Sequence, residues 1–441
     1  MRQNRKNQPS FPLHQSEHRH GRELEEISRI LDENPTLAEV VLQESETDSG
    51  RGAPGMSGEQ ILRCAVVKQM EGLSYDRLAF ALEDSLTLRD FCGFSFDKAP
   101  KRSTLAENIS RIGWRGWKEI TDILTRWADE TGLEKGRKVR IDATAVESHI
   151  RKPTDNQLLY DCVRVLTRLL QELRGKVDFV MTDHRRRAKK RHTQIRNARR
   201  QALRVKPYRD LLQVAAMTRS YVERAFEAAD LADPVLCKLV GKLRHFAELT
   251  DRVIDQTRRR VLQGETVPAS EKVVSIFEEH TDILRKGSRD PVYGHKLFLT
   301  CGKSSLITDC LLERGNPADA TRLQPMLQRQ NRLYGRYPRQ AATDGGFSSG
   351  ENLDWARRQA GIKDMSFSKK CRLKVADMVK SSWVYQQLKK FRAGVEGCIS
   401  FFKRGFGGGR CDWNGWQGFQ QYVHLSVLSY NLLVLARLRM A

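Results

Sequence analysis

The alternation of apolar and polar positions divides the chain into a helical beginning, a mixed middle and a helical end. Apolar residues recur at three- and four-residue steps after Ser57, which opens a helix capping box. Turns at Gly72 and Gly93 separate several short helices, a pattern that fits a helix-turn-helix-like DNA-binding module or a plain helical bundle equally well. We expect residues 1–55 to be a polar, mobile tail with one or two short helices, and residues 56–135 to be a helical, helix-turn-helix-like DNA-binding domain. The basic residues that favour DNA binding there are Lys68, Arg77, Lys101, Arg102 and Arg111.

A change of period at Lys138 marks a second kind of structure. Residues 138–148 alternate apolar and polar side chains with a period of two, which predicts a β-strand containing Asp142. The other predicted elements, in chain order, are a strand over 272–277, a hairpin over 294–314, a helix after Pro317, a short strand ending at Asp344, a helix over 350–360, a strand over 363–367 and helices over 382–406 and 416–438. This order favours an α/β fold, with a mixed sheet flanked by helices.

A largely helical insert at about residues 154–265 interrupts the strands. It contains a run from Arg185 to Arg200 without one acidic residue, and on a helix these charges point in every direction. Such a run either contacts nucleic acid or stays mobile, and we expect contact because the whole chain is basic. The candidate DNA-binding residues of this run are Arg185, Arg186, Arg187, Lys189 and Lys190.

The charge of the chain indicates a polyanionic partner. Its 441 residues are 39% hydrophobic, enough for a large core, and carry a net charge of +23. Nucleic acid is the commonest partner for such a field, and no apolar run has the length of a membrane span. The nine cysteines form no CxxC pair, which argues against a zinc ribbon or a disulfide scaffold. We expect a cytoplasmic, nucleoid-associated protein that does not bind membranes.

The helix over 382–406 carries an unusual charged face. Lys389, Arg392, Glu396 and Lys403 fall within roughly 60° of one another on a helix of about 100° per residue. By itself this pattern is typical of a solvated surface with an i,i+4 pair between Arg392 and Glu396.

Two aspartates give this face a second interpretation. Asp142 lies in the middle of a strand, where carboxylates are rare, although an edge strand facing water would explain it as well. Asp344 ends a strand directly before Gly345 and Gly346, which allow close approach of a ligand. Together with Glu396 they would form an oxygen-ligand site for Mg²⁺ or Mn²⁺, and two such ions suit phosphoryl transfer. The rival carboxylates are Asp155, Asp290, Asp309, Asp354, Glu313 and Glu351.

Three stretches, IDATAVES, ATDGGFSS and FRAGVEGCISFFKRGFGGG, resemble the three acidic blocks of the DDE transposases of bacterial insertion sequences. The last stretch matches the subgroup pattern Y-x2-R-x3-E-x6-K at Arg392, Glu396 and Lys403, while Lys389 stands at the tyrosine position. The resemblance extends over roughly residues 57–438.

The resemblance implies an RNase H-like catalytic domain over residues 136–441 with Asp142, Asp344 and Glu396 as catalytic triad and metal ligands. It further implies two Mg²⁺ or Mn²⁺ ions, cleavage of DNA at the terminal inverted repeats of an element, and strand transfer into target DNA by the freed 3′-hydroxyl. The protein would act as a homo-oligomer on double-stranded DNA. Some relatives use a tryptophan to stack on a flipped base, a role open to Trp413 or Trp416.

Two other functions remain open from the sequence. A protein derived from a transposase could bind DNA without cutting it, although the presence of all three carboxylates argues against this. A nuclease or resolvase on an RNase H-like fold would cut DNA without joining it. Lys389, Arg392, Lys403 and Trp413 complete the predicted DNA-binding residues.

Overall fold

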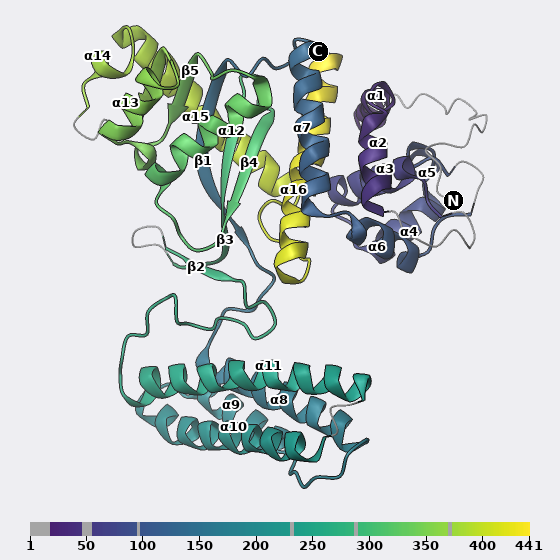
Figure 1. Ribbon diagram of the computed structural model, residues 1–441, viewed down its shortest axis with the longest axis vertical. Coiled ribbons are helices and arrows are strands. Elements are labelled where there is room, and N and C mark those ends of the chain that lie inside the picture. Colours follow the sequence, from purple (N-terminus) through teal and green to yellow (C-terminus); the bar gives the residue numbers. More distant parts are fainter. Residues whose placement is uncertain (1–17, 46–54, 95–97, 230–232, 286–289, 369–372) are drawn as a thin grey trace. The chain divides into compact units, whose positions relative to one another are not determined.

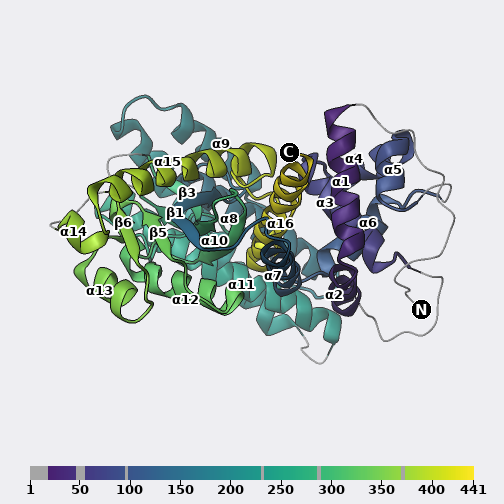
Figure 2. The ribbon, with the colours of Figure 1, turned by 90° about the horizontal axis from the view of Figure 1, so that it is seen from above.

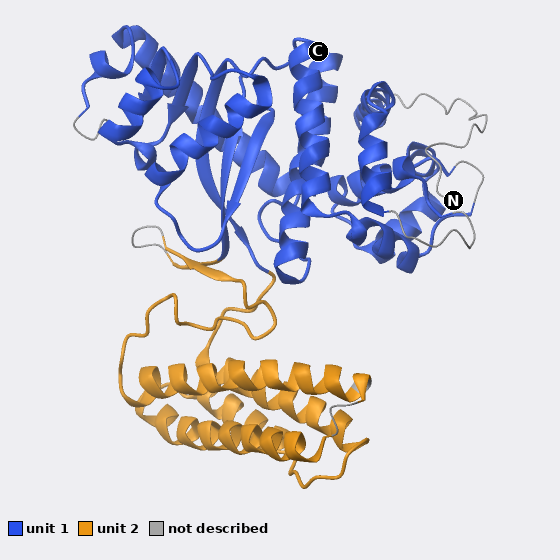
Figure 3. Ribbon diagram, in the orientation of Figure 1, with its two compact units in different colours: residues 1–148, 294–441 blue, residues 149–293 orange. Residues whose placement is uncertain are grey.

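The chain forms two compact units in the computed structural model (Figure 3). Unit 1 comprises residues 1–148 and 294–441, and unit 2 comprises residues 149–293. None of the helices in the described residues combines the length and the hydrophobicity that a transmembrane span needs. The residues that the structure describes are 18–45, 55–94, 98–229, 233–285, 290–368 and 373–441.

The strands form one mixed β-sheet (Figure 1). Its strands are β1 (Lys138–Glu147), β2 (Asp282–Leu284), β3 (Val292–Cys301), β4 (Ile307–Glu313), β5 (Gln340–Thr343) and β6 (Asp364–Phe367). Their order is β2-β3-β1-β5-β6, and β4 also pairs with β3. β1 is antiparallel to β3 and parallel to β5, while β3 is antiparallel to β4 and β5 is parallel to β6. β1 is therefore an interior strand, and an edge-strand explanation of Asp142 is wrong.

Helices cover both faces of this sheet (Figure 2). α15 (Ser382–Gly405) contacts β1, β5 and β6 on one face, while α12 (Leu323–Tyr334) and α13 (Gly350–Arg358) lie on the other. The alternation in β1 follows from this arrangement. Val139 and Ile141 are buried in the core that includes α12 and α13, and Arg140 and Asp142 contact α15. The predicted mixed sheet with flanking helices is confirmed.

The N-terminal region of unit 1 is entirely helical and shares its core with the last helix of the chain. α16 (Gly415–Met440) is buried along most of its length and packs against α1, α3 and α7. The helices of this region are α1 (Arg19–Glu33), α2 (Thr36–Ser45), α3 (Gly58–Met70), α4 (Tyr75–Asp84), α5 (Leu86–Phe91), α6 (Arg102–Arg111) and α7 (Trp114–Glu130). Ser57 caps α3 in the predicted capping box, and Gly72 and Gly93 take the positive φ of tight turns.

The segment predicted as a polar tail contains short helices, as expected, but its described residues 18–45 are packed into the core of unit 1. These residues form α1 and α2, and the side chains of Ile27 and Leu37 are fully buried in the core of unit 1. The segment looked polar because α1 buries only one narrow side and exposes charged residues on the other. Residues 1–17 and 46–54 lie outside the described residues.

Unit 2 is a helical body with its own apolar core, and it includes the residues over which the sequence predicted a largely helical insert. Its helices are α8 (Asp155–Arg174), α9 (Arg185–Asn197), α10 (Ala202–Ala228) and α11 (Pro234–Thr257), followed by a single π-turn, η1 (Arg258–Leu262). The strand predicted at 272–277 is wrong. The backbone N–H of Val273 donates to the side chain of Gln256 at 2.8 Å, and the Gln256 amide donates to the Val273 carbonyl at 3.2 Å. The backbone hydrogen bonds of Val273 are thus satisfied by the side chain of Gln256 and not by a neighbouring strand.

The chain leaves unit 1 after residue 148 and returns to it at residue 294, and both points lie at the same end of the β1–β3 pair. The last paired residues there are Glu147 and Gly294. Glycine is required at position 294 because a Cβ would collide with the backbone of Val146. The end of β1 is also held by the loop after α15, since Glu147 N–H donates to the Gly409 carbonyl at 3.0 Å.

Candidate active site

Asp142 and Asp344 come from neighbouring parallel strands. The last paired residues of β1 and β5 are Ile141 and Thr343, and each is followed directly by one of the two aspartates. The register therefore brings both aspartates to the same level, where β5 ends and β1 continues. The side chain of Asp142 is 9% exposed, because α15 covers it, and Asp344 is half-buried.

The Gly345–Gly346 pair lets the chain turn tightly around Asp344. Asp344 caps the short 3-10 helix η3 (Gly345–Phe347), and one of its carboxylate oxygens accepts a hydrogen bond from Gly346 N–H at 3.0 Å. A Cβ on Gly346 would lie 2.6 Å from the carboxylate of Asp319, so a larger residue at this position would displace the side chain of Asp319. Asp319, in η2 (Asp319–Arg322), is itself paired with Lys296 at 2.6 Å.

Sequence reasoning missed Asp319 as a neighbour of Asp344. Its position after Pro317 and before a helix indicates an ordinary helix start, and no sequence pattern connects it with the strand that ends at Asp344. Since Lys296 already neutralises Asp319, this carboxylate adds little negative charge beside Asp344.

α15 supplies the third carboxylate together with a cation. Ser381 caps the helix by accepting a hydrogen bond from Val384 N–H. The apolar stripe of α15 packs on the sheet, and this orientation directs Arg392 towards β1. Arg392 donates to Asp142 at 2.8 Å through one terminal nitrogen and to Glu396 at 3.1 Å through the other. A single guanidinium thus joins two of the three predicted catalytic residues.

The carboxylates of this site are suitable ligands for a divalent cation, but their positions in the structure do not form a metal-binding site. Carboxylate oxygens are the ligands that Mg²⁺ and Mn²⁺ prefer. Among the described residues, however, no three carboxylate, histidine or cysteine side chains stand close enough together to hold an ion. Glu396 is 70% exposed and reaches Asp142 only through Arg392, whose side chain is 19% exposed. Ligation by all three residues therefore requires Arg392 and Glu396 to move.

Arg140 fixes α15 to the strand that carries Asp142. It lies two residues before Asp142 on the same side of β1, and it donates to the Phe391 carbonyl at 3.1 Å and to Cys398 Sγ at 3.0 Å, both on α15. A third hydrogen bond, of 2.8 Å, joins it to Ser305. Gly394 gives the guanidinium room, because a Cβ there would collide with it. The period of two over residues 138–148 marks Arg140 only as a polar position of the strand.

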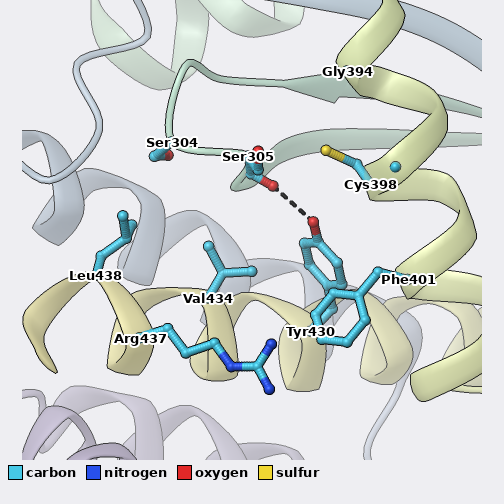
Figure 4. Close-up of a pocket in the computed structure, with 10 residues that line it drawn as sticks. Ser304, Ser305, Gly394, Cys398, Phe401, Tyr430, Val434, Arg437 and Leu438 are labelled. Atoms are coloured by element: carbon cyan, nitrogen blue, oxygen red, sulfur yellow. Dashed lines mark hydrogen bonds between the residues drawn. The ribbon is translucent and has the colours of Figure 1, made fainter. Parts of the chain in front are cut away.

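A cavity of about 350 Å³ lies behind this contact, between α15, α16 and the β3–β4 turn (Figure 4). The Tyr430 hydroxyl donates to the Ser305 carbonyl at 2.9 Å at its edge. None of the three predicted catalytic carboxylates lines it. Its lining residues are Ser304, Ser305, Gly394, Gly397, Cys398, Phe401, Tyr430, Val434, Arg437 and Leu438.

The two lysines of the charged face of α15 differ in their surroundings. Lys389 is exposed. Lys403 is half-buried near the end of β1, where burial lowers the pKa of its ammonium group and the carboxylate of Glu147 opposes that shift. Both lysines lie on the same helix as Arg392, as the sequence pattern predicted.

Trp413 is half-buried within unit 1. Its ring lies 6.3 Å from that of Tyr75 and 6.0 Å from that of Tyr422, and the Lys68 ammonium sits 5.4 Å above it. These contacts favour a packing role. Lys68, which suggested a DNA-binding surface in the sequence, is buried and cannot reach a phosphate.

Trp416 also makes packing contacts, with its ring 4.7 Å from His295 and 6.2 Å from Phe419.

The arginine-rich run forms α9 in unit 2. Ala188 and Ile195 are its buried residues, which gives a helix with a narrow apolar stripe. Arg185 pairs with Asp183 at 2.6 Å, and Arg187 pairs with Asp210. The exposed residues of α9 that the sequence predicted to bind DNA include Arg186, Lys189 and Lys190.

The rival carboxylates lie elsewhere or are already paired. Asp309 makes two hydrogen bonds of 2.6 Å to Arg329, and Asp155 lies in unit 2, 2.9 Å from Arg260. The other rivals are Asp290 and Glu351, both exposed, Glu313, 2.9 Å from Arg322, and Asp354, 3.9 Å from Arg358. None of them follows the last paired residues of β1 and β5.

Two family models match the chain. One, described as "Transposase domain (DUF772)", matches residues 12–111, and the other, described as "Transposase DDE domain", matches residues 274–432. Together they span more than half of the chain, and the second includes Asp344 and Glu396. Comparison with curated proteins and with solved structures found no match. With its mixed sheet, helical insert and helical N-terminal region, the chain belongs to the DDE transposases of insertion sequences.

Proposed function

We propose that Asp142, Asp344 and Glu396 are the catalytic carboxylates of this transposase. The observation that carries the proposal is the register of β1 and β5, which places Asp142 and Asp344 at the same level of two adjacent strands. Glu396 joins them from α15, linked to Asp142 through Arg392. DDE transposases cut and join DNA by phosphoryl transfer and use a divalent metal.

The metal in this proposal is Mg²⁺ or Mn²⁺, as two ions held by these three residues. Bound there, the ions would activate the attacking oxygen and stabilise the leaving oxygen of the scissile phosphate. Asp142, covered by α15, would fix the position of the site, and the exposed Glu396 would close it. Arg392, Lys389 and Lys403 present cations on the same face of α15, where they would hold the DNA backbone.

The DNA partners in this proposal are the terminal inverted repeats of the element and its target DNA. The net charge of +23 supports backbone contact, and the exposed Arg186, Lys189 and Lys190 on α9 offer one surface for it. Arg185 and Arg187 belong to the same proposed surface, although their acidic partners reduce their effective charge. We place the N-terminal helices among the DNA-binding elements too, and propose a homo-oligomer acting in the cytoplasm on the nucleoid.

The proposal is tested by separating cleavage from binding. Asp142→Asn, Asp344→Asn and Glu396→Gln should each reduce nicking of labelled element ends in Mg²⁺ by on the order of 10²-fold or more, because each removes a metal-binding charge. DNA binding should persist. Asp354→Asn is the matched control, since Asp354 is an exposed aspartate on α13, and it should cut normally. Full cleavage by Glu396→Gln would refute its assignment as third ligand.

The same assay, with a target plasmid added, tests the joining step. Joined product is expected from the wild-type protein. Nicking without joined product would favour a nuclease or resolvase, and binding without nicking would favour a protein that only binds DNA.

A further inference from the structure

We propose that Arg392 is an internal latch: without DNA its guanidinium bridges Asp142 and Glu396 and keeps them from a divalent cation, and a DNA phosphate draws it away. This inference rests on the proposed catalytic site. It assigns to Arg392 a task before cleavage, namely to hold the carboxylates apart from the metal until DNA is present.

The bridge engages one oxygen of each carboxylate, and the other oxygen of Asp142, Oδ1, accepts a hydrogen bond from Ala143 N–H at 2.8 Å. Arg392 donates to Oδ2 of Asp142 at 2.8 Å and to Oε1 of Glu396 at 3.1 Å. An oxygen that accepts a charge-assisted hydrogen bond must give it up, or share it, to coordinate an ion. In addition, the positive charge of the guanidinium repels a second cation placed between the same carboxylates. Arg392 and the metal therefore compete.

The two contacts of Arg392 differ in burial. The contact with Asp142 is buried and therefore strong, whereas the contact with Glu396 is exposed and easily broken. The side chain of Asp142 is only 9% exposed, so its charge has lost most of its water and depends on a cationic neighbour. Glu396 is 70% exposed and can exchange its arginine for water at little cost. The bond to Glu396 is therefore easily lost, whereas at Asp142 a departing cation must be replaced by another cation.

Arg392 also has a donor free for a new partner. Its Nε is buried and makes no hydrogen bond within the described part of the chain. A guanidinium binds a phosphate through two parallel N–H groups, and Nε together with one terminal nitrogen forms such a pair. A backbone phosphate would satisfy Nε while taking one terminal nitrogen from a carboxylate. DNA therefore offers Arg392 a hydrogen bond that the closed arrangement leaves unmade.

The latch couples metal binding to DNA binding. If DNA moves Arg392 away from Asp142 and Glu396, it raises the affinity of the site for the cation, and by linkage the cation raises the affinity for DNA. A plain structural ion pair predicts no such coupling. The two possibilities differ in what happens to metal affinity when Arg392 is replaced.

The test measures Mn²⁺ binding to the full chain by electron paramagnetic resonance, first without DNA. Arg392→Gln should bind Mn²⁺ roughly tenfold more tightly than the wild type, because the competing cation is gone. Arg392→Lys, which keeps the charge but lacks the rigid fork whose two terminal nitrogens reach the two carboxylates, should lie between them. Lys390→Gln is the control: it removes one charge from an exposed position of the same helix and should change the affinity little.

A short duplex DNA is then added to each protein. The wild-type affinity for Mn²⁺ should rise towards that of Arg392→Gln, whose own affinity should hardly respond. Equal Mn²⁺ affinities of Arg392→Gln and wild type, with Asp142→Asn binding weakly, would refute the latch and leave the site intact. Unchanged Mn²⁺ binding by Asp142→Asn would instead refute the site on which the latch depends. Circular dichroism of each variant verifies that it is folded.

Discussion

Asp142 illustrates what a carboxylate needs in order to occupy the middle of a sheet. It lies on an interior strand beneath a helix, where an unpaired charge would cost several kcal/mol. Arg392 provides the compensating charge, and Arg140 anchors the helix that carries Arg392. The polar residues of β1 are therefore tied to α15, whereas its apolar residues build the opposite face.

His424 permits a prediction about acid stability at the same scale. It is buried on α16, its ring stacked on Trp114 at 5.5 Å and its Nδ1 3.5 Å from Cys310 Sγ. Burial, reinforced by the nearby cations Lys118 and Arg329, lowers the pKa of His424 to about 3. Above its ordinary pKa of about 6.5 it is neutral in both states. As the pH falls from there towards 3, only the unfolded chain takes up the proton, so stability is lost.

We expect His424 to cost the wild type roughly 1 kcal/mol of unfolding free energy between about pH 7 and pH 5.5. Urea denaturation of the wild type and His424→Gln across this range measures it. The variant should lose less stability on acidification, whatever its stability at neutral pH. Parallel pH profiles for the two proteins would show that His424 does not titrate as stated.

At the scale of elements, the structure explains how much of the site the sequence predicted. The period of two in β1 singles out Asp142 as a candidate residue, and the two glycines that follow Asp344 single out Asp344. Both signals are local, so they can be recognised in the sequence. The i,i+4 pair of Arg392 with Glu396 was predicted for the same reason. The bond from Arg392 to Asp142 was not, because it depends on which side of α15 rests on β1.

Two glycines of α15 give a matched pair of substitutions. Gly394→Ala places a methyl group against the Arg140 guanidinium, which must then give up some of its three hydrogen bonds. We expect a loss of about 1–3 kcal/mol of unfolding free energy. A Cβ at Gly397 meets no other atom within 4 Å, so Gly397→Ala should stabilise the helix by up to about 1 kcal/mol. Thermal denaturation compares them, and equal effects would argue against the Arg140 anchor.

At the scale of the whole molecule, the basic residues are distributed over two units, each of which has its own apolar core. Unit 2 has its own buried cluster and its own basic helix, while the proposed catalytic carboxylates lie in unit 1. The sequence predicted an insert, but it could not show that Arg187 and Arg191 of α9 would pair with Asp210, which lies about twenty residues further along the chain in α10.

This division predicts unequal contributions to DNA binding. If the exposed lysines of α9 bind phosphates, the double variant Lys189→Gln/Lys190→Gln should reduce the slope of log K against log salt by about two, roughly one for each phosphate that is no longer neutralised. Arg187→Gln is the control and should change the slope less, because Asp210 already neutralises Arg187. Fluorescence anisotropy at several salt concentrations measures the slopes. An unchanged slope in the double variant would exclude α9 from the interface.

The pairing of Glu147 with Gly294 has a consequence for how such proteins diversify. Unit 2 departs and returns at two residues that already face each other, so topologically it is an enlarged hairpin loop. Loops whose ends meet can be lengthened at a small entropic cost. A lineage can therefore exchange, shorten or extend this unit without shifting the strand register that aligns Asp142 with Asp344. Under the proposed DNA contact of α9, DNA preference and chemistry can then evolve separately within one chain.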